Sequence, residues 1–338
     1  MPDPSKGAPS GQEWLVEEGI GEHRAIRLAE NGQIAAARLY WPGSLTAGQV
    51  EDARLDQRIR NSPRGVAVFA SGERAHIDRL PASASEGATM RLEVTRSRLA
   101  EAGRVKLAQC RPSYLPLAPA PTLAEQIGSC GDRAKIVRRF PAEAGWEELW
   151  SDASGNFVEF DGGSLVPYPT PAMLLIDIDG SQAPDRLARE AVAPLAAMLR
   201  RMDLGGNIGI DFPTVAEKAR RKEIDELLER ALSGWPHERT AINGFGFLQI
   251  VSRLERPSIL HLLHSDPAGA HARRLLRSAE HLEGPGILAL SGTRDVAEAL
   301  QPSWIEQLER RTGRKVRVSA DSQAWDPELC HVQVVSDD

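Results

Sequence analysis

The sequence predicts a mixed α/β protein of several domains, and two patterns carry that prediction. The first hundred residues contain short β-like runs separated by turn residues, whereas strands and amphipathic helices alternate from residue 165 onward. A length of 338 residues is enough for two or three domains of ordinary size. The composition, with 41% hydrophobic and 26% charged residues, is typical of a soluble globular protein that buries a substantial core.

Strand signals dominate the N-terminal third of the chain. Residues 13–41 predict two or three strands, with a hairpin at Asn31-Gly32 because that pair tolerates the positive φ values of a type I′ turn. Five further β-like runs between residues 50 and 107 have the spacing of strands in a small barrel. The proline-rich segment 110–126 predicts a boundary or linker after them.

A strand–helix–strand pattern follows in the second half of the chain. Residues 171–179 predict a buried strand, and residues 207–212 predict a second one. Between them an amphipathic helix is expected over 183–206, which Pro194 should kink because proline lacks the backbone donor and clashes with the preceding turn. Another helix is expected over 215–232. This order predicts two neighbouring parallel strands with a right-handed connection.

The last part of the chain predicts a compact α/β unit. A polar, histidine-containing break over 261–271 should precede most of it. The expected elements are helices over 271–282 and 293–311 and strands over 286–291, 315–319 and 330–335. Alternating helices and strands of this length are enough for a small domain.

Charge and cysteine content limit the classes of function. The net charge of −6 excludes a uniformly basic nucleic-acid coat, but it leaves room for the local basic patch that phosphate binding needs. Cys110, Cys130 and Cys330 form no CxxC pair, so we expect reduced thiols and neither disulfides nor a thiolate zinc site. Residues 1–12 predict a disordered N-terminus. Because no signal core or membrane-length apolar run is present, a cytoplasmic protein with no membrane partner is expected.

Two aspartates occupy matching places in the two predicted parallel strands. Asp177 is expected to end the first strand and Asp211 the second, so both should emerge at the carboxyl edge of the sheet. Neighbouring carboxylates repel unless a cation joins them, and Mg²⁺ suits such a site because it prefers oxygen ligands and bridges readily to phosphate. This arrangement favours metal-assisted phosphodiester hydrolysis. The alternative is that both aspartates cap the helices that follow them.

The residues around these aspartates resemble a known family. The stretches GGSLVPYPTPAMLLIDIDGS and EAVAPLAAMLRRMDLGGNIGIDF are similar to the catalytic core of the RNase E/G family of bacterial endoribonucleases. The family has a strand ending in Asp-x-Asn, a helix with Glu-Ala, then Asp-Leu-Gly-Gly and a strand ending in Ile-Asp-Phe. The segment INGFGFLQIVSRLERPSI resembles its Phe-Gly-Leu segment. The residues in register with the family pattern are Glu190, Ala191, Asp203, Leu204, Gly205, Gly206, Ile210, Asp211 and Phe212.

The resemblance implies a division of the chain into six segments. They are a disordered stretch over 1–12, RNase H-like strands over 13–45, an inserted OB-fold RNA-binding barrel over 46–108, a linker and reduced RNase H-like region over 109–160, a DNase I-like catalytic core over 161–262 and a small C-terminal α/β domain over 263–338. The short segment between the barrel and the core implies that the family's sensor of the RNA 5′ monophosphate is missing. Cleavage is therefore expected to be independent of 5′ phosphorylation.

The resemblance also implies the activity and the site. In the family two aspartates hold one Mg²⁺, which activates water for attack on single-stranded RNA; carried over, these are Asp177 and Asp211, with Mn²⁺ as an alternative ion. Asp179 stands where the family has an asparagine that positions the first carboxylate, and it either adds a metal ligand or disturbs the geometry. The other departures near the site are Ala188 in place of Asn, Gly244 in place of Arg and Gln249 in place of Glu.

A second departure concerns zinc. Where the family has a CPxC motif whose cysteines share zinc between subunits, this chain has HLLHSDPAGAHARR. Neither zinc nor a zinc-linked dimer is therefore expected. His261, His264 and His271 could bind a metal instead, because HxxH on one helical face brings two ligands together, or they could form a solvated polar face.

RNA binding needs cations for the phosphates and aromatic faces for unstacked bases. Phe69 matches a family aromatic that stacks on RNA, and the alternative is a core residue on an alternating strand. Basic residues at the start of the helix after Asp211 oppose the helix dipole, which favours a phosphate role over a merely solvated face. The cationic candidates are Arg96, Arg98, Arg104 and Lys106 in the barrel region and Lys218, Arg220 and Arg221 in that helix.

These features predict a Mg²⁺-dependent endoribonuclease that cuts single-stranded RNA in RNA processing or decay. One alternative is an RNA-binding protein of the same fold with weak or no nuclease activity, which the departures from the family pattern favour. Another is an unrelated α/β enzyme that acts on a phosphorylated small molecule; the barrel and the lack of a Gly-rich phosphate loop weigh against it.

Overall fold

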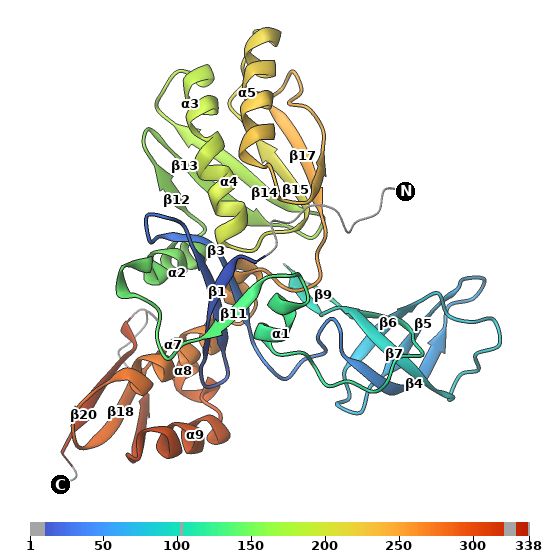
Figure 1. Cartoon of the computed structure of the whole chain (residues 1–338), viewed down its shortest axis with the longest axis vertical. Coiled ribbons are helices and arrows are strands. Elements are labelled where there is room, and N and C mark those ends of the chain that lie inside the picture. Colours follow the sequence, from blue (N-terminus) through green and yellow to red (C-terminus); the bar gives the residue numbers. More distant parts are fainter. Residues whose placement is uncertain (1–10, 102–103, 321–328, 337–338) are drawn as a thin grey trace.

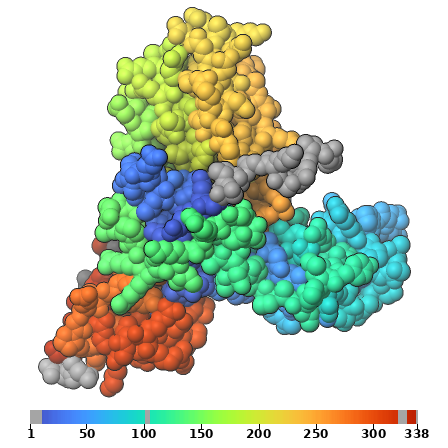
Figure 2. Space-filling view, viewed as in Figure 1, coloured from blue at the N-terminus to red at the C-terminus, as the bar shows by residue number. Residues whose placement is uncertain are grey.

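A four-stranded sheet lies at the centre of the molecule, with three further parts around it. The computed structural model describes residues 11–101, 104–320 and 329–336, and within them the chain forms a closed barrel and sheets of six, four, three and two strands. In Figure 1 the barrel lies to one side of the central sheet, the six-stranded sheet above it and the C-terminal unit below it. Figure 2 shows the barrel projecting from the side of the central part. The expected mixed α/β class with a small barrel is confirmed.

The central sheet has the order β11-β1-β2-β3, and β11 pairs in parallel with β1, so the chain returns to its first strand after the barrel. The hairpin at Asn31-Gly32 is present, but Gly32 alone of this pair has a positive φ, 80°. Ala29 N–H donates to the Gln33 carbonyl at 2.9 Å, which makes a three-residue loop ending in a left-handed glycine, and the expected type I′ turn is wrong. The strands are β1 (Glu13–Glu18), β2 (His23–Leu28), β3 (Ile34–Tyr40) and β11 (Arg133–Ile136); the helices after the barrel are α1 (Leu123–Gly128) and α2 (Trp146–Gly155), with the 3₁₀ turn η1 (Ala142–Ala144) before α2.

The barrel closes because its last strand, β10, pairs in parallel with β6 and antiparallel with β7. Leu55, Ile77 and Leu92 are fully buried in its core. A closed five-stranded barrel is compatible with the expected OB fold. Its strands are β4 (Val50–Arg58), β5 (Arg64–Val68), β6 (Arg74–Asp78), β7 (Thr89–Arg96) and β10 (Ala108–Pro112), and a small ribbon, β8 (Leu99–Glu101) and β9 (Arg104–Lys106), lies between β7 and β10 in the sequence.

The six-stranded sheet has the order β12-β13-β14-β15-β17-β16, with β14 and β15 parallel as expected. Helices α3, α4 and α5 lie over one of its faces (Figure 1), where Ile176, Ile208 and Ile210 are fully buried. The expected helix over 183–206 is divided at Ala191, because Pro194 cannot donate to the carbonyl four residues earlier. The strands are β12 (Val158–Phe160), β13 (Gly163–Pro169), β14 (Leu174–Gly180), β15 (Gly206–Asp211), β17 (Phe247–Ser252) and β16 (His237–Arg239); the helices are α3 (Pro184–Glu190), α4 (Val192–Arg201) and α5 (Lys218–Ala231).

The C-terminal unit differs from its expected form in two places. The polar break expected over 261–271 is mostly helical, because the Ser258 and Asp266 side chains cap two successive helices there. The single helix expected over 293–311 is two helices, the second of which starts at Pro302. The elements are α6 (Ile259–Ser265), α7 (Pro267–His281), β18 (Ile287–Gly292), α8 (Arg294–Ala299), α9 (Pro302–Thr312), β19 (Val316–Ala320) and β20 (His331–Val335).

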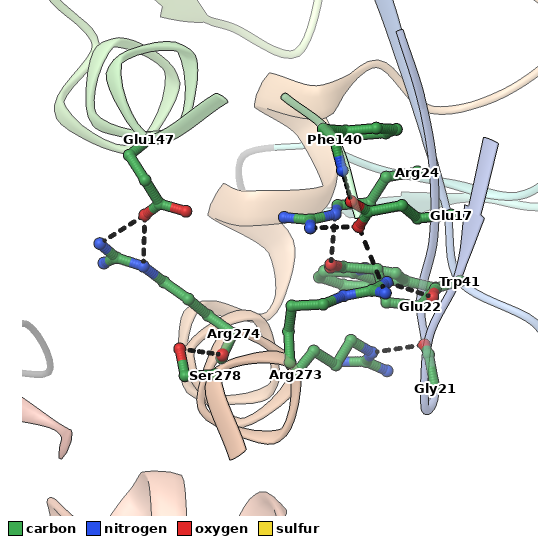
Figure 3. Close-up of polar contacts among 11 residues, drawn as sticks. Glu17, Gly21, Glu22, Arg24, Trp41, Phe140, Glu147, Arg273, Arg274 and Ser278 are labelled. Atoms are coloured by element: carbon green, nitrogen blue, oxygen red, sulfur yellow. Dashed lines mark hydrogen bonds and ion pairs between the residues drawn. The ribbon is translucent and has the colours of Figure 1, made fainter. Parts of the chain in front are cut away.

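A buried group of charged side chains joins the central sheet to α7. Glu17 of β1 accepts hydrogen bonds from Arg24 at 2.5 Å and from the backbone N–H of Phe140, and its carboxylate lies 3.3 Å from Arg277 of α7. Arg273, also on α7, donates to the Gly21 carbonyl at 3.0 Å (Figure 3). We call Glu17, Arg24 and Arg277 the junction cluster.

Of the helices described, none has the length and apolar character needed to cross a membrane.

Candidate active site

Asp177 and Asp211 lie directly opposite each other on β14 and β15. The pairing of these parallel strands makes them Cα partners, which places their Cα atoms about 4.8 Å apart by ordinary strand spacing. Partners in register direct their side chains to the same face of the sheet. Asp177 does not end its strand as expected, because β14 continues to Gly180 alongside β13. Asp211 is the last residue of β15.

The face that carries the two aspartates is the one that the helices leave open. Ile176 and Ile210 are buried on the opposite face, whereas Asp177 and Asp211 are exposed. Within the described part of the chain, neither carboxylate has a hydrogen-bond or ion-pair partner among the side chains. Neither caps a helix, because the N-cap of α3 is Ala183 and that of α5 is Glu217.

The pair fits a hard divalent cation through its donor chemistry. Two neighbouring carboxylates with no counter-ion offer oxygen ligands and leave the remaining positions to water and substrate, as Mg²⁺ requires. Asp179 is not gathered with them into a three-ligand site: no group of three or more His, Cys, Asp or Glu side chains that could hold a metal occurs among the described residues. The Asp179 carboxylate accepts a hydrogen bond from the backbone N–H of Gly180 at 2.8 Å.

The open face beside Asp211 is packed with apolar side chains. Phe247 of β17 is the cross-strand partner of Asp211. A Cβ on Gly209 would lie 2.7 Å from an atom of the Phe247 ring and 2.8 Å from the sulfur of Met173. A side chain at position 209 would therefore have to displace the ring and the thioether, which occupy the space over it. Gln249, one of the departures from the family pattern, faces Gly209 across the strands.

The loop that precedes β17 is tied to the residues just after Asp211. Phe212 N–H donates to the Gly246 carbonyl at 3.1 Å, and the Thr214 hydroxyl donates to the Phe245 carbonyl at 3.4 Å. Gly246 has φ +91°, and a Cβ there would lie 2.2 Å from the Phe212 carbonyl oxygen. This close contact requires glycine and fixes the loop beside the aspartate pair.

The Asp-Leu-Gly-Gly motif has a structural role. Asp203 follows α4 with a positive φ of 51°, a conformation that aspartate tolerates better than most residues. Its carboxylate accepts two hydrogen bonds from Arg256, at 2.6 Å and 3.0 Å. This bidentate pair connects the end of α4 to the segment after β17, and it contributes no ligand to the aspartate pair.

Phe69 is not available for base stacking. Its side chain is 3% exposed and packs in the barrel core, so the core alternative holds and the stacking interpretation is wrong. Phe69 directly follows β5 and continues the alternation that directs Ala67 into the barrel core.

The basic residues near the barrel are arranged in different ways. Arg96 is half-buried and donates to the Leu107 carbonyl at 2.6 Å, which is a structural contact. Arg98 is exposed and lines a large cavity. Lys106 is half-buried, and the side chain of Arg104 lies outside the described part of the structure.

The basic residues of α5 are partly used within the protein. Arg221 donates to the carbonyls of Val215 and Ala216 at 2.6 Å and 2.8 Å, and thereby closes the loop after Asp211. Arg220 lies 3.9 Å from Asp185 and 3.7 Å from Glu217. Lys218 is exposed at the start of the helix. Among these three, Lys218 keeps the strongest case for a phosphate contact.

The three histidines do not form a metal site. His261 is bonded to the Ser258 hydroxyl at 2.7 Å, and His264 lies 3.0 Å from the Ala153 carbonyl. His271 packs edge-on against Trp150, with 5.8 Å between ring centroids. A metal site built from all three histidines is therefore absent among the described residues, and the solvated alternative is wrong for the buried His261.

A large cavity lies away from the aspartates. It measures about 860 Å³ and is lined by the barrel, α1 and the segment after β17, including Arg98, Arg253 and Cys130. Arg253 follows the end of β17 that is remote from Asp211, because Asp211 pairs with Phe247 at the start of that strand. Volume alone thus does not identify the candidate site; the paired carboxylates do.

Sequence reasoning missed an exposed aromatic residue in the loop beside the pair. Phe245 is 84% exposed and lies in the loop described above. The signal in the sequence was the run Gly-Phe-Gly-Phe. Its two glycines indicate a turn or loop, where a large apolar side chain is unusual.

Comparison with known proteins finds ribonuclease G of Escherichia coli (strain K12), of Salmonella typhimurium (strain SL1344) and of Shigella flexneri, each 30% identical over 131 residues. The match covers 35% of this chain and 27% of each relative, so the chain matches only about a quarter of the length of these curated relatives. No family model matches the chain. The similarity supports a relation to RNase E/G-like ribonucleases over about a third of the chain.

Proposed function

We propose that this chain is an RNase E/G-like endoribonuclease that hydrolyses phosphodiester bonds in single-stranded RNA. The observation that carries the proposal is the Asp177–Asp211 pair, in register on an open sheet face and without a counter-ion among the described residues. The similarity to ribonuclease G and the closed barrel support the same conclusion. The role would be RNA processing or decay.

Asp177 and Asp211 would hold one Mg²⁺, or Mn²⁺ in its place. The bound ion would supply charge neutralisation at the phosphate and a more acidic water. The protein itself contributes the position of both carboxylates, which the β14–β15 pairing fixes, and the open face, which admits a polymer. Lys218 would contact a phosphate at the start of α5, where the helix dipole adds to its positive charge.

From the family resemblance we propose in addition that the rate of cleavage does not depend on the phosphorylation state of the RNA 5′ end. Substrates with a 5′ monophosphate and a 5′ hydroxyl but the same sequence should be cut at equal rates. A clear preference for the monophosphate would contradict this part of the proposal alone.

A fluorophore-labelled single-stranded RNA, incubated with the purified protein in Mg²⁺ or EDTA, tests the central claim. We expect cleavage in Mg²⁺ only, and a loss of several kcal/mol of rate acceleration, roughly a thousandfold, in Asp211→Asn. Glu238→Gln is the matched control, because Glu238 is an exposed carboxylate of the edge strand β16, paired with Val251 away from the site. It should cleave as the wild type does.

The same experiment decides the second candidate function. The departures from the family pattern and the lack of a third described metal ligand favour an RNA-binding protein with little or no nuclease activity. Retention of the RNA without cleavage in Mg²⁺ or Mn²⁺ would establish that function and overturn the nuclease.

A further inference from the structure

An exposed aromatic ring lies beside the aspartate pair. Phe245 is 84% exposed, the highest exposure of any phenylalanine side chain noted among the described residues. Exposed apolar residues are common singly, but the loop that carries this one adjoins an apolar surface on the open face. The members of this surface are Phe247, Met173 and the half-exposed Tyr168 on β13.

The ring is held in place by its own loop. The Asn243 side-chain oxygen accepts hydrogen bonds from the backbone N–H groups of Phe245 and Phe247, at 2.8 Å and 3.1 Å. Gly246 N–H donates to the Asn243 carbonyl at 3.2 Å. Because the backbone is fixed on both sides of Phe245, binding a ligand to its ring costs little conformational entropy.

The loop also places the ring close to the carboxylates. The Gly246 carbonyl is bonded to the residue after Asp211, and Phe247 is the cross-strand partner of Asp211. Phe245 is therefore two residues from the position opposite Asp211. A ligand whose phosphate reaches a cation on the aspartate pair has its next flat, apolar group within reach of this ring.

We propose that Phe245 is a stacking site for an unpaired base of single-stranded RNA, next to the phosphate that the Asp177–Asp211 pair engages. The inference rests on the proposed function for the placing of that phosphate. An aromatic face accepts any base, so the contact selects for strand state and not for sequence. A base inside a duplex is stacked on both faces and cannot use it.

The test measures RNA affinity without cleavage. A short RNA with a terminal fluorophore and an internal 2-aminopurine is titrated with full-length protein in EDTA and again in Ca²⁺. We expect Phe245→Ala to weaken binding about 5- to 150-fold, the usual effect of losing one stacked base, and to abolish the quenching of 2-aminopurine. Phe245→Trp should restore both signals, which a purely structural role would not do.

The matched control is Phe157→Ala, which removes a half-exposed ring next to the edge strand β12. It should bind RNA as the wild type does, and the effect of Phe245→Ala should vanish when the RNA is annealed to its complement. Wild-type affinity in Phe245→Ala would overturn the stacking site. So would a changed oligomeric state with unchanged RNA affinity, because the ring would then be a protein contact.

The outcomes separate this inference from the proposed function. Loss of affinity in Phe245→Ala, together with no cleavage by the wild type in Mg²⁺, would keep the stacking site and overturn the nuclease. Mg²⁺-dependent cleavage with no effect of Phe245→Ala on affinity would keep the nuclease and overturn the stacking site. Failure of the wild type to bind RNA would overturn both.

Discussion

The protein treats clustered charges in opposite ways at two places. In the junction cluster Glu17 is 0% exposed and is matched by Arg24 and Arg277, with Phe140 N–H as a further donor. On the open sheet face, Asp177 and Asp211 are exposed side by side and have no side-chain partner among the described residues. Protein side chains neutralise the charge of Glu17, whereas the charges of Asp177 and Asp211 are open to ions from the solution.

Burial explains the difference. An unmatched charge inside a protein costs several kcal/mol, so Glu17 is compatible with folding only beside its arginines. Arg24 is further held over the Trp146 ring, 4.6 Å from its centroid. Water screens the two exposed aspartates, so the fold tolerates their repulsion and they remain free to bind a cation. The comparison separates charges that maintain the fold from charges that are available for function.

The largest effect should come from breaking the junction cluster. Glu17→Gln removes the carboxylate that Arg24 and Arg277 share and leaves Glu22, 4.0 Å from Arg24, as the buried carboxylate beside them, so it should lower the free energy of unfolding by about 3–5 kcal/mol. Urea unfolding followed by circular dichroism measures the change. Glu298→Gln removes an exposed partner of Arg294 on α8 and should have no measurable effect. Equal effects of the two substitutions would contradict the role assigned to burial.

The next effect concerns the packing around the aspartate pair. Gly209→Ala places a methyl group 2.7 Å from the Phe247 ring and 2.8 Å from Met173, so it should destabilise the protein by about 1–3 kcal/mol. Gly155→Ala is the control, because nothing lies within 4 Å of a Cβ at the end of α2. It should leave stability unchanged or raise it. If Gly209→Ala were as well tolerated, the open face would not be packed as described.

The junction should also respond to pH. Burial, the largest cause, lowers the pKa of His23 and His281 below the ordinary value of 6.5, and Arg277 lowers both further. The unfolded chain therefore binds more protons at these two histidines than the folded protein does. The free energy of unfolding should fall as the pH drops through 6.5 toward the lowered pKa values.

Urea midpoints at about pH 7.5 and about pH 5.5 test this expectation. The midpoint should fall on acidification by more in the wild type than in His23→Gln. His331→Gln, which changes an exposed histidine of β20, should behave as the wild type does. A pH response that is unchanged in His23→Gln would assign it to other groups.

Local signals predicted much of the fold around the site. The apolar strands, the glycine stop after α4 and the break before Pro194 all follow from residues close in sequence. The helix N-caps at Ser258 and Asp266-Pro267 are equally local signals. They predict α6 and α7, whereas the histidines between them suggested a polar break.

Other features depend on pairing that no local pattern encodes. A shift of one residue between β14 and β15 would turn one aspartate to the covered face, so their register had to be observed. The alternation around Phe69 is the same whether its side chain faces into or out of the barrel, so its place in the core had to be observed. Arg277 reaches Glu17 across 260 residues, a distance over which spacing carries no information.

The smallest effect should come from the aspartate pair itself, with the opposite sign. In EDTA, Asp211→Asn should raise the free energy of unfolding by a few tenths of a kcal/mol and by no more than about 1 kcal/mol, because like charges directly opposite in a sheet destabilise it. Mg²⁺ should stabilise the wild type and not the variant, since only a folded protein with both carboxylates binds the ion. Glu238→Gln should keep the wild-type response to Mg²⁺. An Asp211→Asn variant less stable than the wild type in EDTA would mean that protein groups hold this carboxylate, as they do Glu17, and the contrast between the two regions would be lost.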